Sequence, residues 1–181
     1  MFQKAVFQFS KRMFKEESFP AEFRDTVLHM IFKGGKSKSE VLSDNRFIHS
    51  KNWFPRMVES LVVEEGLRRP LVEGSSIYQI GGQAGHRSEE LVFVVKSIIA
   101  RMRQQGKVAI IQSYDISKFF DKEMVEDAVL TCLSRGANPK AVRLWHKLND
   151  KTRIRVRTGA GLTEWGEVGA VLGQGLSLIH I

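Results

Sequence analysis

The stretch NPKAVRLWHKLNDKTRIRVRT, residues 138–158, holds two different hydrophobic periodicities in direct succession. It opens with Asn-Pro, which is typical of a helix start, and Val142, Trp145 and Leu148 then follow at helical spacing. From residue 153 onward, arginine alternates strictly with Ile, Val and Thr, which is the period of a strand. The change of period predicts a fold that mixes α and β elements.

The alternating segment predicts a half-buried strand with one cationic face. Arg153, Arg155 and Arg157 share that face, where they either meet a phosphate backbone or lie in solvent on an edge strand. The small residues of 159–161 allow the chain to turn back into a second strand around 163–168. We therefore expect a β-hairpin here.

Three further segments have apolar residues at helical spacing and a glycine where the helix should stop. They cover residues 53–65, 88–105 and 122–135. The stripe expected in the first consists of Phe54, Met57, Val58, Leu61 and Val62. Ser88 is expected to cap the second helix. The stripe expected to be buried in that helix consists of Leu91, Val94, Val95, Ile98, Ile99 and Met102.

Two strands are expected among these helices. Residues 22–32 predict a short helix that runs into a strand, and the β-branched run 108–111 suits a strand buried on both faces. The second strand would end near Asp115. A carboxylate held there beside solvent either binds a divalent metal such as magnesium or caps the helix that follows.

The composition is that of a folded, basic domain. The chain has 181 residues, enough for one domain or for a piece of a larger protein. Its 28 Lys and Arg outnumber its 20 Asp and Glu, and the resulting charge of +8 favours polyanions such as nucleic acid as partners. With 43% hydrophobic and 27% charged residues, wholesale disorder is excluded.

Several classes of protein are excluded by what the sequence lacks. Cys132 is the single cysteine, which excludes a disulfide scaffold and a zinc finger. The first residues lack the continuous apolar core of a signal peptide, and no apolar run has the length of a membrane span. We therefore expect an intracellular protein, nuclear or cytoplasmic, that is neither secreted nor membrane-bound, and no protein partner is implied.

Four short motifs follow one another along the chain. They are Asp44-Asn45-Arg46-Phe47-Ile48, QIGGQAGHRS at 79–88, DISKFFD at 115–121 and Gly173-Gln174-Gly175. The third, with an aromatic residue five places after its first aspartate, resembles the first catalytic motif of reverse transcriptases. The others resemble the Arg-bearing fingers motif, the motif before the catalytic strand and the later Gln-Gly motif. Over residues 28–175 the chain thus resembles the reverse transcriptases of non-LTR retrotransposons.

The resemblance implies RNA-directed DNA synthesis from deoxynucleoside triphosphates on a primed RNA or DNA template. It implies that Asp115 is catalytic and binds Mg2+ or Mn2+ together with the carbonyl of Ile116, and that Phe120, with Phe119 as the alternative, selects the sugar. The residues implied to bind the triphosphate are Lys33, Lys36, Arg46, Gln174 and Gly175. Those implied to bind template or primer are Arg87, Arg153, Arg155 and Arg157.

Some of these residues have a second interpretation. The lysines of the turn 33–38 suit a solvated loop as well as a triphosphate contact. Arg46 and Arg87 suit a brace to a carboxylate within the fingers as well as a contact to phosphate or template.

The resemblance also implies a partial right-hand polymerase of the α+β class, with an antiparallel-rich sheet backed by helices. The expected parts are an N-terminal extension at 1–20, a fingers region at 21–106, a partial palm at 107–175 and a tail unlike the family at 176–181. The sequence contains no Asp-Asp pair and no thumb, so this fragment is expected to be inactive by itself. The alternatives are a non-catalytic nucleic-acid-binding remnant of a retroelement polymerase and a doubly wound α/β phosphotransferase with Asp115 as nucleophile.

Overall fold

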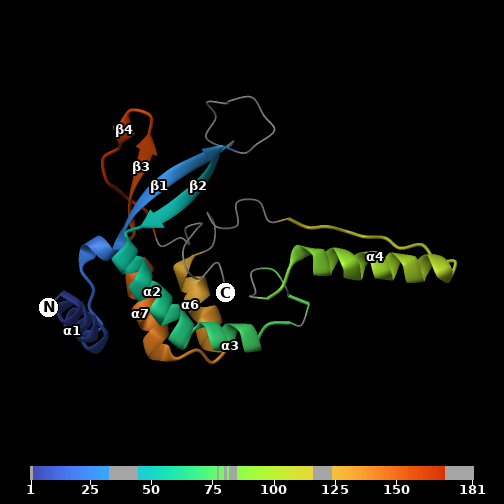
Figure 1. Ribbon diagram of the computed structural model, residues 1–181, viewed down its shortest axis with the longest axis horizontal. Coiled ribbons are helices and arrows are strands. Elements are labelled where there is room, and N and C mark those ends of the chain that lie inside the picture. The colour runs from blue at the N-terminus through green and yellow to red at the C-terminus, as the bar shows by residue number, and fades with distance from the viewer. Residues whose placement is uncertain are drawn as a thin grey trace.

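The computed structural model describes residues 2–32, 45–76, 78–79, 81, 85–115 and 124–169. Figure 1 shows a group of helices with a sheet rising from one end of it. The described elements are α1 (Phe2–Glu16), the 3-10 helix η1 (Ala21–Arg24), β1 (Asp25–Phe32), β2 (Asn45–Lys51), α2 (Trp53–Gly66), α3 (Arg68–Glu73), α4 (Ser88–Gln104), α6 (Val125–Ser134), α7 (Pro139–Asn149), β3 (Arg153–Thr158), β4 (Gly161–Leu162) and β5 (Gly166–Glu167).

The hydrophobic core lies among the helices. α7 packs against both α2 and α6 (Figure 1). Trp145, Val58 and Val125 are fully buried at the centre of this group, and Met13 of α1 and Phe23 of η1 join the same cluster. Removing this apolar surface from water is the main source of stability in the fold.

The ends of α7 and α6 follow from local sequence. Asn138 caps α7, because its Oδ1 accepts a hydrogen bond of 2.9 Å from the backbone N–H of Lys140, and Pro139 fills the first helical position. Gly136, just after α6, adopts a φ of +81°, where a side chain would be strained. The helix starting at 139, with Trp145 buried, is therefore confirmed.

The predicted apolar stripe of α2 is rotated from the observed one. The helix has the expected extent, but the side chains that it buries are Pro55, Val58, Glu59, Val62 and Val63. Met57 and Leu61, which were expected to be buried, are exposed. The reason is that α7 packs against the side of α2 that carries Val58 and Glu59.

The sheet combines one parallel pair with three antiparallel pairs. β1 pairs with β2 in antiparallel and with β3 in parallel orientation, and β3 pairs in antiparallel orientation with β4 and β5. The strand order is therefore β2-β1-β3-β4, with β5 also on the outer edge of β3. The mixed α and β class and a hairpin after 158 are confirmed, but the returning strand, expected at 163–168, is divided into β4 and β5 with residues 163–165 between them. The parallel pairing of β1 with β3 has no local signal in the sequence.

The two faces of the sheet have different surroundings. Thr26, Leu28 and Lys51 share one face by register and are all buried. Lys51 donates from this face to α2 and α7, so the helices contact the sheet at the end where Lys51 lies. The opposite face carries Arg46 and Arg157, which are both exposed.

The α4 helix projects from the rest of the molecule (Figure 1). It has no buried residue, and Ile98, in the middle of the stripe expected to be buried, is 54% exposed. Its N-cap position is Arg87, without a side-chain cap, so the expected cap by Ser88 is wrong. The predicted helix is confirmed, but no described helix or strand packs against its apolar stripe. In the described part of the chain, no helix combines the length and apolar character needed to cross a membrane.

The segment 107–115 is not a strand, so the strand expected at 108–111 is wrong. Ile110 is 92% exposed and Val108 86% exposed, in place of the predicted burial on both faces. Among the described strands none pairs with this segment, and its backbone therefore lacks the ladder that defines a strand.

Candidate nucleic-acid interface

One face of the sheet collects cationic side chains from three strands. His29 of β1 pairs with Arg157 of β3, and Ile31 of β1 pairs with Arg46 of β2. Paired residues, and residues two apart on one strand, point to the same side of a sheet. Arg46, His29, Arg153, Arg155 and Arg157 therefore share one side, which we call the cationic face.

Arg153 is held at one end of this face by Asp25. Its Nε and Nη2 atoms donate to the two carboxylate oxygens of Asp25, each over 2.7 Å. This two-bond geometry is the strongest arrangement that an arginine makes with a carboxylate. The hydrogen bond to Asp25 raises the pKa of Arg153 above its already high ordinary value, so this guanidinium stays charged. Asp25 thus compensates one of the charges on the face.

Trp165 covers two arginines of the cationic face. The guanidinium carbon of Arg155 lies 4.5 Å from the centre of the indole ring, and that of Arg153 lies 5.4 Å from it. Such distances are typical of cation–π contacts. The Nε atom of Arg155 is buried and has no hydrogen-bond partner among the described residues. The ring rather than an acceptor therefore stabilises this guanidinium.

The segment 163–165, which links β4 to β5 along the edge of β3, places Trp165 over the arginines. β4 pairs with residues 157–158 of β3 and β5 pairs with 153–154, so the chain between them spans the middle of one strand. Thr163 fixes this span, because its Oγ1 accepts from the N–H of Val156 over 2.9 Å while its own N–H donates to the Val156 carbonyl over 3.1 Å. Trp165 follows two residues later, beside Arg155.

Arg46 and Arg157 are the exposed arginines of the face, and neither has a carboxylate partner among the described residues. Both are exposed, and in the described ranges neither makes a salt bridge or a side-chain hydrogen bond. They lie on the strands that flank β1, opposite Ile31 and His29, so roughly 10 Å separates them across the sheet and roughly 7 Å along it. Two exposed guanidiniums with no carboxylate partner are available to a bound anion.

The structure brings together only some of the residues singled out in the sequence. Arg46, Arg153, Arg155 and Arg157 share the cationic face, whereas Arg87 lies at the start of α4. Asp115 is exposed at the end of the segment 107–115. The remaining candidates lie outside the described residues, namely Lys33, Lys36, Ile116, Phe119, Phe120, Gln174 and Gly175.

The described residues do not form a metal centre. Within the ranges that the structure describes, no three His, Cys, Asp or Glu side chains are grouped so that they could hold an ion. Asp115 supplies one carboxylate, and the residues that follow it, 116–123, lie outside the described ranges. A hard cation such as magnesium needs several oxygen ligands, so no chemical step is assigned to a metal here.

Sequence reasoning missed three residues that shape these elements. Asp25 and Trp165 were not singled out, although an aromatic residue beside an arginine-rich strand is itself a signal for a cation–π contact. Glu59 was also missed. Glu59 lies between Val58 and Val62, two apolar residues of the predicted helix. A glutamate that is buried on an apolar helix face indicates a cationic partner.

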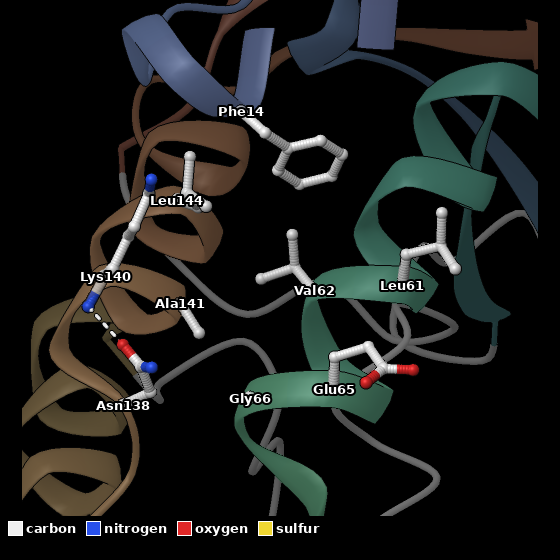
Figure 2. A pocket seen from close by; sticks show the side chains of 9 residues that line it. All are labelled: Phe14, Leu61, Val62, Glu65, Gly66, Asn138, Lys140, Ala141 and Leu144. Atoms are coloured by element: carbon white, nitrogen blue, oxygen red, sulfur yellow. Dashed lines mark hydrogen bonds between the residues drawn. The ribbon is translucent and has the colours of Figure 1, made fainter. Parts of the chain in front are cut away.

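Figure 2 shows a separate pocket of about 370 Å³, formed by α1, α2 and α7. Its walls are mostly apolar, with Phe14, Val62 and Leu144 facing the opening, and its polar residues lie at the margins. Its ionisable residues, Glu65 and Lys140, stand on opposite walls and form no salt bridge with each other. The pocket therefore offers packing surface rather than a reaction site.

Comparison with known proteins gives this chain no family. A scan against models of protein families found no match, and neither did a search of curated proteins.

Proposed function

We propose that this chain binds nucleic acid through the cationic face and is a fragment of a reverse transcriptase of the non-LTR retrotransposon type. The observation that carries the proposal is the position of Arg46 and Arg157. Two residues from distant segments, each singled out in the sequence as a contact to nucleotide or template, share one exposed face without a carboxylate partner in the described part of the chain. Such a face attracts phosphates.

In the parent enzyme this fragment supplies the fingers, at 21–106, and the first part of the palm, at 107–175. The parent reaction is metal-dependent, RNA-directed DNA synthesis. The proposed roles follow the motif resemblance, with Asp115 and the Ile116 carbonyl binding Mg2+ or Mn2+ and with Phe120 under the incoming sugar. The triphosphate is bound by Lys33, Lys36, Arg46, Gln174 and Gly175.

The fragment is proposed to bind without catalysing. Its sequence holds no Asp-Asp pair, and a single carboxylate cannot hold two ions. Primer extension with the purified chain should therefore equal that of the Asp115→Asn variant. Extension by the unchanged chain alone would contradict this part of the proposal.

Binding itself is tested by titrating the chain with a labelled oligonucleotide at several salt concentrations. We expect weak, sequence-independent binding. The logarithm of the association constant should fall linearly with the logarithm of the salt concentration. Replacing Arg153, Arg155 and Arg157 together by glutamine should flatten that slope, by about 0.7 for each phosphate of a single strand that the variant no longer neutralises.

A matched control removes the same charge elsewhere. The variant with Arg69, Arg101 and Arg103 changed to glutamine loses three cations from α3 and α4, outside the cationic face. It should keep the salt slope of the unchanged chain. Equal slopes in both triple variants would show that the cationic face is not the contact surface, and absence of binding at low salt would contradict nucleic-acid binding altogether.

The two alternatives fare differently. A doubly wound, metal-dependent phosphotransferase needs Asp115 at the end of a central parallel strand, and the exposed, unpaired segment before Asp115 does not favour that placement. A non-catalytic remnant is favoured by the same cationic face. It is distinguished by restoring the missing catalytic motif in a longer chain, where Asp115→Asn should abolish extension only if the parent is an enzyme.

A further inference from the structure

We infer that Trp165 is a stacking platform for an unpaired nucleic-acid base, with Arg157 binding the phosphate beside it. Arg46, which lies two strands away and four residues farther along the sheet from Arg155, would bind a phosphate farther along the same strand of nucleic acid. The inference rests on the proposed function and adds to it a definite site and a definite ligand class. It starts from the position of Trp165, whose side chain lies on the arginines of β3 and remains 40% exposed.

The inner side of the ring is occupied and the rest of it is open. Arg155 and Arg153 lie at 4.5 and 5.4 Å from the ring centre. Arg153 is held by its hydrogen bonds to Asp25. The pairing of β3 with β5 holds the backbone beneath the arginines and the backbone next to Trp165. The ring is therefore held in place before any ligand arrives, which lowers the entropy that a ligand would lose on stacking.

The charges around the ring decide which ligand it accepts. Asp25 and Glu167 both face Arg153, which leaves the charges of Arg155, Arg157 and Arg46 without a carboxylate in the described part of the face. A cationic ligand such as a methylated lysine is repelled by the two guanidiniums behind the ring. A planar group that carries a negative charge fits both the ring and its surroundings, and a nucleotide within a strand has this chemistry.

The base must be unpaired. Stacking on a protein ring requires one free face of the base, which a base inside a duplex offers only at the end of the helix. Every base has such a face, so this site contributes affinity without reading sequence. Arg157, which is two residues from Arg155 on the same side of β3, lies where the phosphate next to a stacked base would pass.

The test compares two oligomers with the same number of phosphates. One is a twelve-residue oligo(dT) and the other is a twelve-residue abasic strand, so only the first can stack. We expect the unchanged chain to bind oligo(dT) about 5- to 150-fold more tightly, which corresponds to the range measured for base–aromatic stacking. Trp165→Leu should abolish this preference and leave binding of the abasic strand unchanged.

Two variants separate stacking from a structural role. Trp165→Phe keeps a ring and should restore most of the preference. Trp53→Leu removes a tryptophan that is even more exposed but lies at the start of α2, and should keep the preference in full. Thermal unfolding of each variant shows whether the fold is intact.

Each outcome is decisive. A preference for oligo(dT) that survives in folded Trp165→Leu overturns the stacking site, and so does equal binding of the two oligomers by the unchanged chain. In both cases nucleic-acid binding by the arginines stands. If neither oligomer binds at low salt, the proposed function itself fails.

Discussion

Lys51 Nζ and Glu59 Oε2 lie 3.1 Å apart, and the two side chains are only 2% and 1% exposed. The ammonium also donates to the Leu148 carbonyl over 3.1 Å and to Asn149 Oδ1 over 2.8 Å. The Asn149 amide in turn donates to Glu59 Oε1 over 3.0 Å. All three ammonium protons are therefore used, and the pair joins the end of β2 to α2 and α7.

Glu59→Ala should destabilise the protein by about 3–5 kcal/mol, because it leaves the Lys51 ammonium buried without its counter-charge. Urea unfolding followed by circular dichroism measures the loss. The double variant Lys51→Met with Glu59→Leu should lose less stability than Lys51→Met alone or Glu59→Leu alone, since no buried charge then remains. A loss in the double variant equal to the sum of these two single losses would show that the pair is not coupled.

Gly66→Ala should destabilise by about 1–3 kcal/mol, because a Cβ at this position would overlap the Cβ of Ala141 where α2 meets α7. Figure 2 shows Gly66 on α2 and Ala141 on α7, two of the helices that line the pocket. Ala141→Gly in the same chain should recover part of the loss. Gly159→Ala is the matched control, since nothing lies within 4 Å of the added carbon, and its stability should be almost unchanged.

Ile98→Ala should change the free energy of unfolding by no more than about 0.5 kcal/mol, because Ile98 lies exposed on α4. Leu148→Ala, in the buried face of α7, should cost about 2–5 kcal/mol. The sequence pattern alone predicts a large loss for both. Chemical denaturation measures the free energy of unfolding of both variants. A large loss in Ile98→Ala would show that the α4 stripe is buried, and a small loss that it is exposed.

The Cys132 thiol should react slowly with iodoacetamide in the native protein and rapidly in urea. The side chain is buried in the helical core, and burial raises the pKa of this thiol, with Arg135 opposing the shift. Alkylation followed by mass spectrometry measures both rates. Fast labelling under native conditions would contradict the packing of α6.

The same shift predicts a pH dependence of stability. The native state keeps the thiol proton to higher pH than the unfolded chain does, so the stability contributed by this group is complete below the unfolded pKa and is lost as the pH rises through the folded pKa. The Cys132→Ala variant should lack this part of the alkaline loss.

Local signals in the sequence determined several elements correctly. The Asn-Pro start of α7, the alternation in β3 and the turn at 159–161 depend on residues close to one another in the chain. Caps, turn residues and hydrophobic periods act over a few residues, so these elements were predictable.

Contacts between distant segments determined the rest. The α4 stripe has the period of a buried face, but burial needs a partner, and no described element provides one. Glu59 lies inside because Lys51 and Asn149 meet it there, and both come from other elements. β1 pairs with β3 across more than a hundred residues of chain, which places Arg46 and Arg157 on one face and Asp25 against Arg153. The sequence was sufficient to single out the arginines. Only the tertiary structure decided which of them have a carboxylate or an aromatic ring as partner, because the position of such a partner depends on the packing of the whole chain.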